Sequence, residues 1–266
     1  MTDLCTNLGG IRAAAFRIAP HVHRTPVFRS ASLDRILDAE LTFKCENFQK
    51  VGAFKFRGAC NAVGSLEEAE LKRGVATHSS GNHAAALALA AKLEGSSAHI
   101  VMPSNASAIK KAAVEGYGAT ITYCEPTLEA RESALARIVK SEGRVEIHPY
   151  NDAQIIAGQG TAALELLEEV DNLEVVMAPV GGGGLLSGTS IAVSEARPAA
   201  KVIGAEPHGA DDAFRSLETG TIQPSIEPRT IADGLLTSLG GLTFAILQER
   251  CEGIVTVAEE SIVEAM

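Results

Sequence analysis

The sequence predicts an α/β fold of two doubly wound, three-layer domains, because strand-like and helix-like patterns alternate along most of the chain. Between residues 74 and 150, short apolar runs typical of strands alternate with longer runs typical of helices. Each predicted helix here is followed by a glycine, a common helix C-terminal signal, at Gly95, Gly118 and Gly143. Short glycine-marked connections between strands and helices indicate parallel βαβ units.

A second alternating series begins after residue 150. We expect helices at 160–170, 185–196 and 242–250, and strands at 174–180 and 201–206. The N-terminal part predicts a helix at 11–18, an extended segment at 24–27, a short helix capped by Ser30, a strand at 41–48 and a helix at 56–66. We therefore expect a small domain at 74–150 and a large domain formed by 1–73 and 151–266. Because the chain stops at Met266 inside a predicted helix, we expect the large domain to be incomplete at its C-terminal end.

Composition and charge exclude several classes of function. The 266 residues carry a formal net charge of −10, whereas a nucleic-acid-binding protein needs a basic face. The longest apolar run, residues 84–91, is too short for a membrane span, and residues 1–5 lack the features of a signal peptide. The 5 cysteines are widely spaced and form no Cys-x-x-Cys pair, which is typical of reduced thiols. We therefore expect a cytoplasmic protein that binds neither nucleic acid nor a membrane.

Lys55 lies between Phe54 and Phe56, with Gly52 before it and Gly58 after it. Aromatic neighbours make a lysine easier to desolvate, and desolvation favours the neutral amine. A neutral amine near pH 7 can attack a carbonyl carbon and form a Schiff base. Taken alone, the segment is better explained by a solvated surface lysine, because lysines are rarely buried. The rest of the chain reverses that preference.

Four consecutive glycines, Gly181 to Gly184, follow a segment that we expect to be a buried strand and precede a predicted helix. Backbone without side chains at a helix N-terminus offers N–H donors and the positive end of the helix dipole, which suit a phosphate. A flexible turn without a ligand is one alternative, although ordering four glycines is costly. A dinucleotide site with Glu206 as ribose-binding acid is another, but Leu185 occupies the middle position of the Gly-x-Gly-x-x-Gly pattern. A phosphate site without a nucleotide pattern, together with a Schiff-base lysine, indicates pyridoxal phosphate.

The segment Ser79–His83 lies where a predicted parallel strand ends and a helix begins, the edge at which α/β proteins bind ligands. Asn82 either caps this helix or bonds a hydroxyl of the cofactor ring. Ser80 offers a hydroxyl to the substrate. From its position alone, His83 is interpreted as structural, because the first turn of a helix is an ordinary place for a polar residue.

Five motifs occur together in one order along the chain. They are Gly-Ala-Phe-Lys-Phe-Arg-Gly-Ala around Lys55, Ser-Ser-Gly-Asn-His at 79–83, Ala-Gly-Gln-Gly-Thr at 157–161, Pro-Val-Gly-Gly-Gly-Gly-Leu-Leu-Ser-Gly at 179–188 and Thr-Ile-Ala-Asp-Gly at 230–234. Together they resemble the serine racemase and threonine dehydratase family, the fold-type II pyridoxal phosphate enzymes, over nearly the whole chain. The resemblance implies the tryptophan-synthase-β-like fold, in which the large domain binds the cofactor.

The resemblance also implies a set of site residues. Lys55 forms the Schiff base, Phe54 packs beside the cofactor ring, and Asn82 bonds the ring hydroxyl. The implied phosphate-binding backbone is that of Gly181, Gly182, Gly183, Gly184 and Leu185. The residues implied for the substrate are Ser79, Ser80, Asn82, His83 and Arg131, the last lying in Glu-Ala-Arg-Glu-Ser at the mouth of the site.

Two reactions are open to a family member of this kind. Lys55, as the base, removes the Cα proton of an amino acid bound to the cofactor, and its pKa should lie near the working pH. Loss of a β-hydroxyl then leads to a keto acid and ammonia, whereas reprotonation from the opposite face inverts the Cα centre. Ser80 is the candidate donor on that face. Because the dehydratases often have alanine there, Ser80 favours a serine racemase-like enzyme.

Two alternatives remain beside that interpretation. One is a catabolic threonine or serine dehydratase (ammonia-lyase), which shares the same first step. The other belongs to a different class: a catalytically inactive homologue that retains the residues of the cofactor site.

The segment Glu206–Asp212 resembles the divalent-cation loop of the family. The resemblance implies Glu206, the carbonyl of Ala210 and Asp212 as ligands, and oxygen ligands suit Mg²⁺ or Ca²⁺ rather than zinc. The alternative is that Asp211 or Asp212 merely caps the following helix. As partners we expect a small amino-acid substrate and a second copy of the chain in a homodimer.

Overall fold

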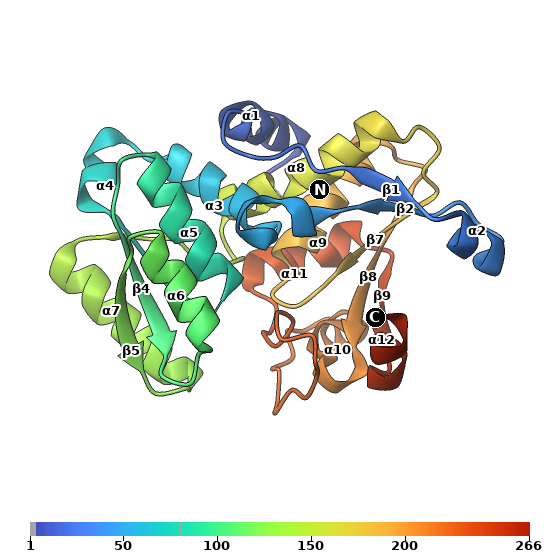
Figure 1. The fold of residues 1–266 in the computed structure, drawn as a ribbon. Coiled ribbons are helices and arrows are strands. Elements are labelled where there is room, and N and C mark those ends of the chain that lie inside the picture. The colour runs from blue at the N-terminus through green and yellow to red at the C-terminus, as the bar shows by residue number, and fades with distance from the viewer. Residues whose placement is uncertain (1–3, 80) are drawn as a thin grey trace.

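The computed structural model describes residues 4–79 and 81–266 and confirms the predicted α/β fold. Two lobes lie side by side in Figure 1, and each is built on a parallel sheet. Within the described residues, no helix has both the length and the apolar character that crossing a bilayer requires.

The lobe drawn mainly in green in Figure 1 contains a parallel sheet of order β5-β4-β3-β6. Its strands are β3 (Val75–His78), β4 (Ala98–Pro103), β5 (Thr120–Cys124) and β6 (Val145–Glu146), and its helices are α4 (Glu68–Arg73), α5 (Asn82–Leu93), α6 (Ala108–Gly116) and α7 (Leu128–Glu142). Successive strand residues point to opposite faces. Val75 and Ile100 therefore pack in the cluster that contains α5, while Ala76 and Val101 pack against Leu135 of α7. Helices thus cover both faces of this sheet.

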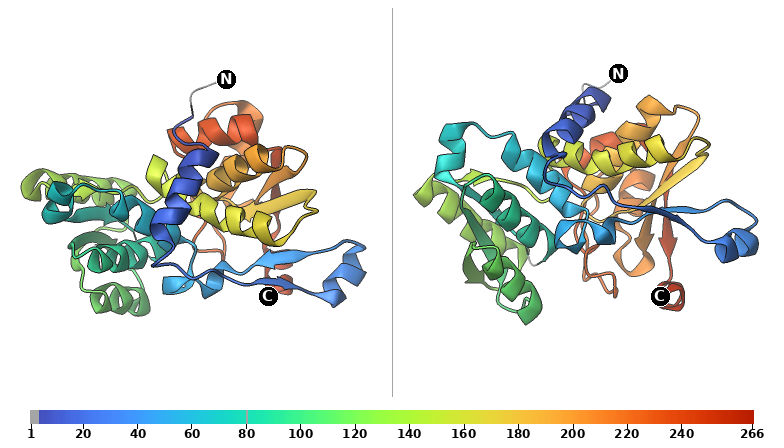
Figure 2. Two further views of the ribbon diagram at one scale, coloured as in Figure 1. Left: turned by 90° about the horizontal axis from the view of Figure 1, so that it is seen from above. Right: turned by 45° about the horizontal axis from the view of Figure 1, so that its top comes forward.

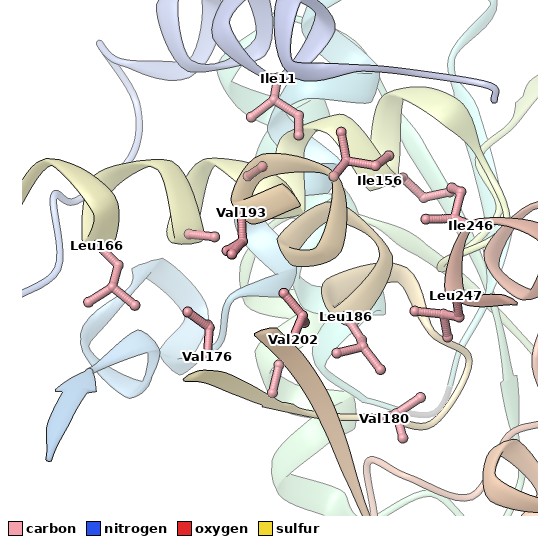
Figure 3. Close-up of a cluster of buried hydrophobic side chains, with 14 of the residues drawn as sticks. Ile11, Ile156, Leu166, Val176, Val180, Leu186, Val193, Val202, Ile246 and Leu247 are labelled. Atoms are coloured by element: carbon pink, nitrogen blue, oxygen red, sulfur yellow. The ribbon is translucent and has the colours of Figure 1, made fainter. Parts of the chain in front are cut away.

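The second lobe contains a parallel sheet of order β7-β8-β9, with strands β7 (Val175–Pro179), β8 (Lys201–Pro207) and β9 (Gly253–Val257). Helices that share a core with it include α1 (Leu8–Ile18), α8 (Ala153–Glu169), α9 (Gly184–Ala196) and α11 (Gly241–Arg250). Figure 3 shows this core, with Val202 of β8 lying near Leu186 of α9. Two shorter helices follow β8 and β9, α10 (Asp212–Thr219) and α12 (Glu259–Ala265). On the other face of β7, Val175 and Met177 are 45% and 57% exposed.

An N-terminal arm projects from the second lobe in Figures 1 and 2. It is an antiparallel ribbon of β1 (Val27–Arg29) and β2 (Thr42–Lys44), joined through α2 (Ala31–Leu37). The strand predicted at 41–48 is too long, because after β2 the chain turns into two 3-10 helices, η1 (Glu46–Phe48) and η2 (Lys50–Gly52). The turn directs the Glu46 carboxylate inward, where it accepts a 2.8 Å hydrogen bond from Nε of the buried Arg57.

Helix α3 (Lys55–Gly64) lies between the lobes and begins at Lys55. Its buried side chains, such as Phe56, belong to the same cluster as β3 and α5. On its other side α3 crosses α8 closely, because a Cβ on Gly158 would lie only 2.6 Å from Gly58 Cα. Since α3 packs against both lobes, the proposed domain limits at 73 and 150 stay predictions.

Candidate active site

Helix α3 presents Lys55 at its N-terminal end. The Lys55 Nζ donates a 2.9 Å hydrogen bond to the carbonyl oxygen of Pro149. Desolvation lowers the pKa of Lys55 to about 8. The two flanking aromatics have different surroundings, since Nζ lies 5.3 Å from the ring centroid of Phe54 whereas Phe56 is buried in the core. A fraction of this amine is therefore neutral and nucleophilic at physiological pH.

The glycine loop follows β7 and leads into α9. Gly183 precedes the first helical residue with a φ of 88°, a conformation that favours glycine. Side chains are excluded nearby as well, because a Cβ on Gly182 would lie 2.3 Å from Cδ1 of Tyr150. Thr243 fastens the loop from α11 through a 2.9 Å hydrogen bond from its Oγ1 to the Gly182 carbonyl. The loop is thus held in one shape at a helix N-terminus, where backbone N–H groups lack intrahelical acceptors.

The loop His148–Asn151 brings the lysine and the glycine loop together. Pro149 accepts the hydrogen bond from Lys55, and the next residue, Tyr150, packs its ring against Gly182. Asn151 Oδ1 accepts a 2.8 Å hydrogen bond from the backbone N–H of Leu242 in α11. Sequence patterns did not single this loop out. One signal was available, since the loop follows β6, and residues after a parallel strand lie at the ligand-binding edge of the sheet.

The segment after β3 reaches the same edge of the first sheet, because β3 and β6 are parallel neighbours. Ser79 Oγ accepts a 3.3 Å hydrogen bond from the Gly81 N–H. Helix α5 has Gly81 as its N-cap and begins with the exposed Asn82, so Asn82 does not cap it. Ser80 lies outside the described residues.

His83, one residue further along α5, is buried. Its Nε2 lies 3.5 Å from the Ile147 carbonyl, and its Nδ1 has no hydrogen-bond partner within the described parts of the chain. Desolvation lowers the pKa of His83 well below its ordinary value. Contact of this side chain with a substrate stays a prediction.

Arg131 lies in the first turn of α7, and its Nε donates a 3.3 Å hydrogen bond to the Thr127 carbonyl. Desolvation lowers the pKa of His78 to about 4, and the positive charge of Arg131 adds to this effect. The His78 ring lies 6.4 Å from that of His148, so Arg131 is on the side of the first lobe that faces the loop His148–Asn151. Its contact with a substrate stays a prediction.

The predicted cation ligands lie at the end of β8 and the start of α10. Glu206 and Asp212 are both buried, and desolvation and their mutual repulsion raise the pKa of Glu206 to about 8. Desolvation also raises the pKa of Asp212 to about 6, and its Oδ2 has no hydrogen-bond partner among the described residues. Glu206 Oε1 accepts a 2.6 Å hydrogen bond from the backbone N–H of Phe214 in α10. The side chain of Asp211, at the N-cap position of α10, makes no capping hydrogen bond.

Within the described residues neither of the two predicted carboxylate ligands forms an ion pair, although the charge of Arg215, which pairs with Asp211, lowers the pKa of Asp212 against the desolvation. The backbone carbonyl of buried Ala210, in the short helix η3 (His208–Ala210), is the third predicted ligand. No group of three or more His, Cys, Asp or Glu side chains suited to a metal occurs in the described residues. Oxygen donors and an unpaired buried carboxylate oxygen fit a hard cation such as Mg²⁺ or Ca²⁺. Ligation itself stays a prediction.

The main site fits pyridoxal phosphate. A lysine with a lowered pKa suits an aldehyde, and the backbone cradle at the start of α9, which leaves no space for side chains, suits a phosphate. The loop His148–Asn151 touches both, so the two are parts of one site.

Comparisons with known proteins agree with this chemistry. Residues 18–266 match the family model described as "Pyridoxal-phosphate dependent enzyme". The chain is 51% identical to serine racemase of Dictyostelium discoideum over 97% of this chain and 81% of that protein. It is 49% identical to β-hydroxyaspartate dehydratase of Paracoccus denitrificans over 96% of this chain and 81% of that protein. The structure of maize serine racemase superposes with a TM-score of 0.97 and 46% identity, covering 98% of this chain and 80% of that one. The chain therefore belongs to the pyridoxal-phosphate dependent enzymes.

Proposed function

We propose that this enzyme racemises serine and eliminates water from serine- and threonine-type hydroxyamino acids, with pyridoxal phosphate as its cofactor. The main support for the proposal is that the loop His148–Asn151 contacts both the candidate Schiff-base lysine and the candidate phosphate-binding loop. Pro149 accepts a 2.9 Å hydrogen bond from the amine of Lys55, while Tyr150 covers the glycine loop. Similarity to a serine racemase and to a hydroxyamino-acid dehydratase supports both reactions.

The cofactor would be held by Lys55, Phe54, Asn82 and the backbone of Gly181, Gly182, Gly183, Gly184 and Leu185. When bound, pyridoxal phosphate withdraws electrons from the substrate Cα and so lowers the cost of removing its proton. Lys55 Nζ would take that proton, because a base with a pKa of about 8 is partly neutral at the working pH. The Pro149 carbonyl helps to orient Nζ for this transfer.

The substrate carboxylate would be bound by the segment at the start of α5 and by α7. The proposed contacts are Ser79, Ser80, Asn82, His83 and Arg131. The end of β3 and the helix dipole of α5 favour an anion at this point. Ser80 Oγ would return a proton to Cα on the face opposite Lys55, which gives inversion.

Dehydration is the second candidate function, and similarity to the β-hydroxyaspartate dehydratase favours it. It needs the same proton removal by Lys55 but no donor on the opposite face. The two activities therefore differ in their products from L-serine: D-serine from racemisation, pyruvate and ammonia from elimination.

Three further properties complete the proposal. Glu206, the Ala210 carbonyl and Asp212 would bind Mg²⁺ or Ca²⁺, because desolvation and mutual repulsion act on two buried carboxylates there and raise their pKa values despite the nearby Arg215. A homodimer is supported by the exposed apolar side chains of the N-terminal arm, among them Phe28, Ile36 and Leu37. The five free cysteines support a cytoplasmic location.

The test begins with purified protein and pyridoxal phosphate. Attachment to Lys55 gives a visible absorption band, which Lys55→Ala should abolish. Lys50→Ala is the matched control and should keep the band, because Lys50 lies near Phe56 and not at Pro149. D-Serine and pyruvate are then measured from L-serine. A band without product from serine, threonine or β-hydroxyaspartate would support the inactive homologue instead.

A further inference from the structure

The side chain of His148 forms hydrogen bonds with the backbone that directly follows it. Its Nδ1 lies 2.9 Å from the backbone nitrogen of Asn151 and 3.3 Å from that of Tyr150. A backbone N–H can only donate, so Nδ1 must be the acceptor and cannot carry a proton. The neutral ring therefore has its hydrogen on Nε2, and the side chain closes the turn from residue 148 to residue 151.

This turn contacts three separate parts of the site. Pro149, inside the turn, accepts the hydrogen bond from Lys55. Tyr150 packs against Gly182, and a Cβ on Gly184 would lie 3.1 Å from Tyr150 Cβ. Asn151, at the end of the turn, bonds the N–H of Leu242 at the start of α11. A change in the turn would therefore move the lysine's acceptor and the wall of the phosphate loop together.

The surroundings of His148 keep its ring neutral. Its ring packs edge-on against the Tyr150 ring, with centroids 4.6 Å apart, and against the His78 ring. Desolvation and the positive charge of Lys55 lower the pKa of His148 to about 4. The Nδ1 lone pair is thus available at the pH at which the enzyme would work.

We propose that His148 is a positioning residue of the active site, whose Nδ1 closes the His148–Asn151 turn and thereby places Pro149 against Lys55 and Tyr150 against the glycine loop. The inference rests on the proposed function for its effect on turnover. Its structural part, the dependence of the turn and of Lys55 on Nδ1, can be measured without cofactor.

Two variants separate the acceptor from the shape of the side chain. In His148→Asn, Oδ1 is bonded to Cγ as Nδ1 is, so it can accept the same backbone hydrogen bonds. In His148→Leu, the side chain has nearly the same shape as asparagine but accepts nothing. Both variants remove the imidazole ring and its packing against Tyr150, so they differ only in the amide that supplies the acceptor.

The first measurement uses protein without cofactor. Hydrogen exchange of a peptide that covers residues 149–151 should be at least tenfold faster in His148→Leu than in His148→Asn. The rate at which acetic anhydride labels Lys55 at fixed pH should also change at least threefold in the leucine variant only. Thermal unfolding of both variants checks that they are folded.

The second measurement uses the protein loaded with pyridoxal phosphate. His148→Leu should lower kcat with L-serine at least tenfold and weaken cofactor binding at least fivefold, and His148→Asn should restore at least a third of the kcat. Equal kcat and equal Lys55 labelling in the two variants would overturn the proposal, whatever their unfolding temperatures. If the unaltered protein formed no product, the proposed function would fail, and hydrogen exchange and Lys55 labelling would still decide the role of His148.

Discussion

Lys55 owes its reactivity to its surroundings more than to its two phenylalanine neighbours. The Pro149 carbonyl holds its amine, and desolvation shifts its pKa down to about 8. A carbonyl acceptor favours the charged form, so burial is the stronger of these opposing effects. The amine stays hydrogen-bonded in a defined place and still loses its proton far more readily than a solvated lysine does.

This pKa predicts how cofactor attachment depends on pH. Only the neutral amine attacks the cofactor aldehyde, and the neutral fraction rises as pH increases through about 8. The rate at which the visible band appears should therefore rise about tenfold per pH unit below that value and level off above it. Stopped-flow absorbance between pH 6 and 10 provides the measurement. A midpoint near that of a free lysine, about 10.4, would show that burial does not tune this residue.

At this scale, the sequence singles out Lys55 but not its hydrogen-bond partner. The segment around Lys55 fits a solvated lysine when taken alone, and only the glycine loop and the other motifs make Lys55 a candidate for the Schiff base. Pro149 is not singled out, because a backbone carbonyl carries no signature in the side-chain pattern and lies 94 residues away. The burial of Phe56 in the core shared with β3 and α5 likewise depends on distant parts of the chain.

Among the elements, the loop between β7 and α9 depends on the absence of side chains. Gly182→Ala should weaken pyridoxal phosphate binding at least tenfold, because the new Cβ would lie within 2.3 Å of a Tyr150 ring atom. Either the ring or the loop must then move. Titration of the visible band measures the effect.

Gly116→Ala serves as the control for that substitution. A Cβ on Gly116, at the end of α6, meets nothing within 4 Å among the described residues. Cofactor binding should be unchanged, and stability should change by no more than about 1 kcal/mol. Similar cofactor affinity in the two alanine variants would contradict the proposal that the glycine loop binds the cofactor phosphate.

The junction of β8 and α10 should respond to cations. Mg²⁺ or Ca²⁺ would neutralise the buried carboxylates of Glu206 and Asp212. A cation present at about 100 times its Kd should raise the free energy of unfolding by about 2.7 kcal/mol. Thermal unfolding with added cation and with chelator measures the difference. Asp212→Asn should abolish the response and, without cation, should unfold at a higher temperature than the unaltered protein, since it removes a repulsive charge. A response that persists in Asp212→Asn would place the cation elsewhere.

At the scale of the whole molecule, an ion pair between the two lobes lies next to the candidate active site. Lys110 of α6 pairs with Asp233, which lies between α10 and α11. The same lysine lies against the loop after β3, because a Cβ on Gly81 would be 3.4 Å from its Nζ. Exposed pairs contribute only about 0.2–1 kcal/mol. Lys110→Met should therefore raise the KM for L-serine by up to about fivefold and leave kcat nearly unchanged.

A second substitution makes this prediction specific. Lys72 pairs with Glu68 within α4, so Lys72→Met removes a comparable exposed pair that does not join the lobes. Its KM should equal that of the unaltered protein. Salt should raise the KM of the unaltered protein but not that of Lys110→Met. Equal salt dependence in all three proteins would contradict a role for the inter-lobe pair.

The parallel sheets were predictable, because alternating apolar runs and glycine signals depend on local sequence. The long-range features were not. The ribbon of β1 and β2 pairs strands of only three residues, too short for a periodic signal. Helix α8 begins at Ala153 rather than 160, because Asp152 caps it and Gly158 and Gly160, which weaken a helical pattern, are required by close packing. The need for glycine at such positions can be recognised only once the neighbouring helix is known.

The position of α8 and α1 between the lobes has a consequence for how the protein melts. Consecutive residues of α8, Ile155 and Ile156, belong to the two different cores, as do Ile18 and Ile11 of α1. Neither core can unfold without removing packing contacts from a helix that also belongs to the other core. Heating should therefore produce one cooperative unfolding transition, with the two halves losing structure at the same temperature.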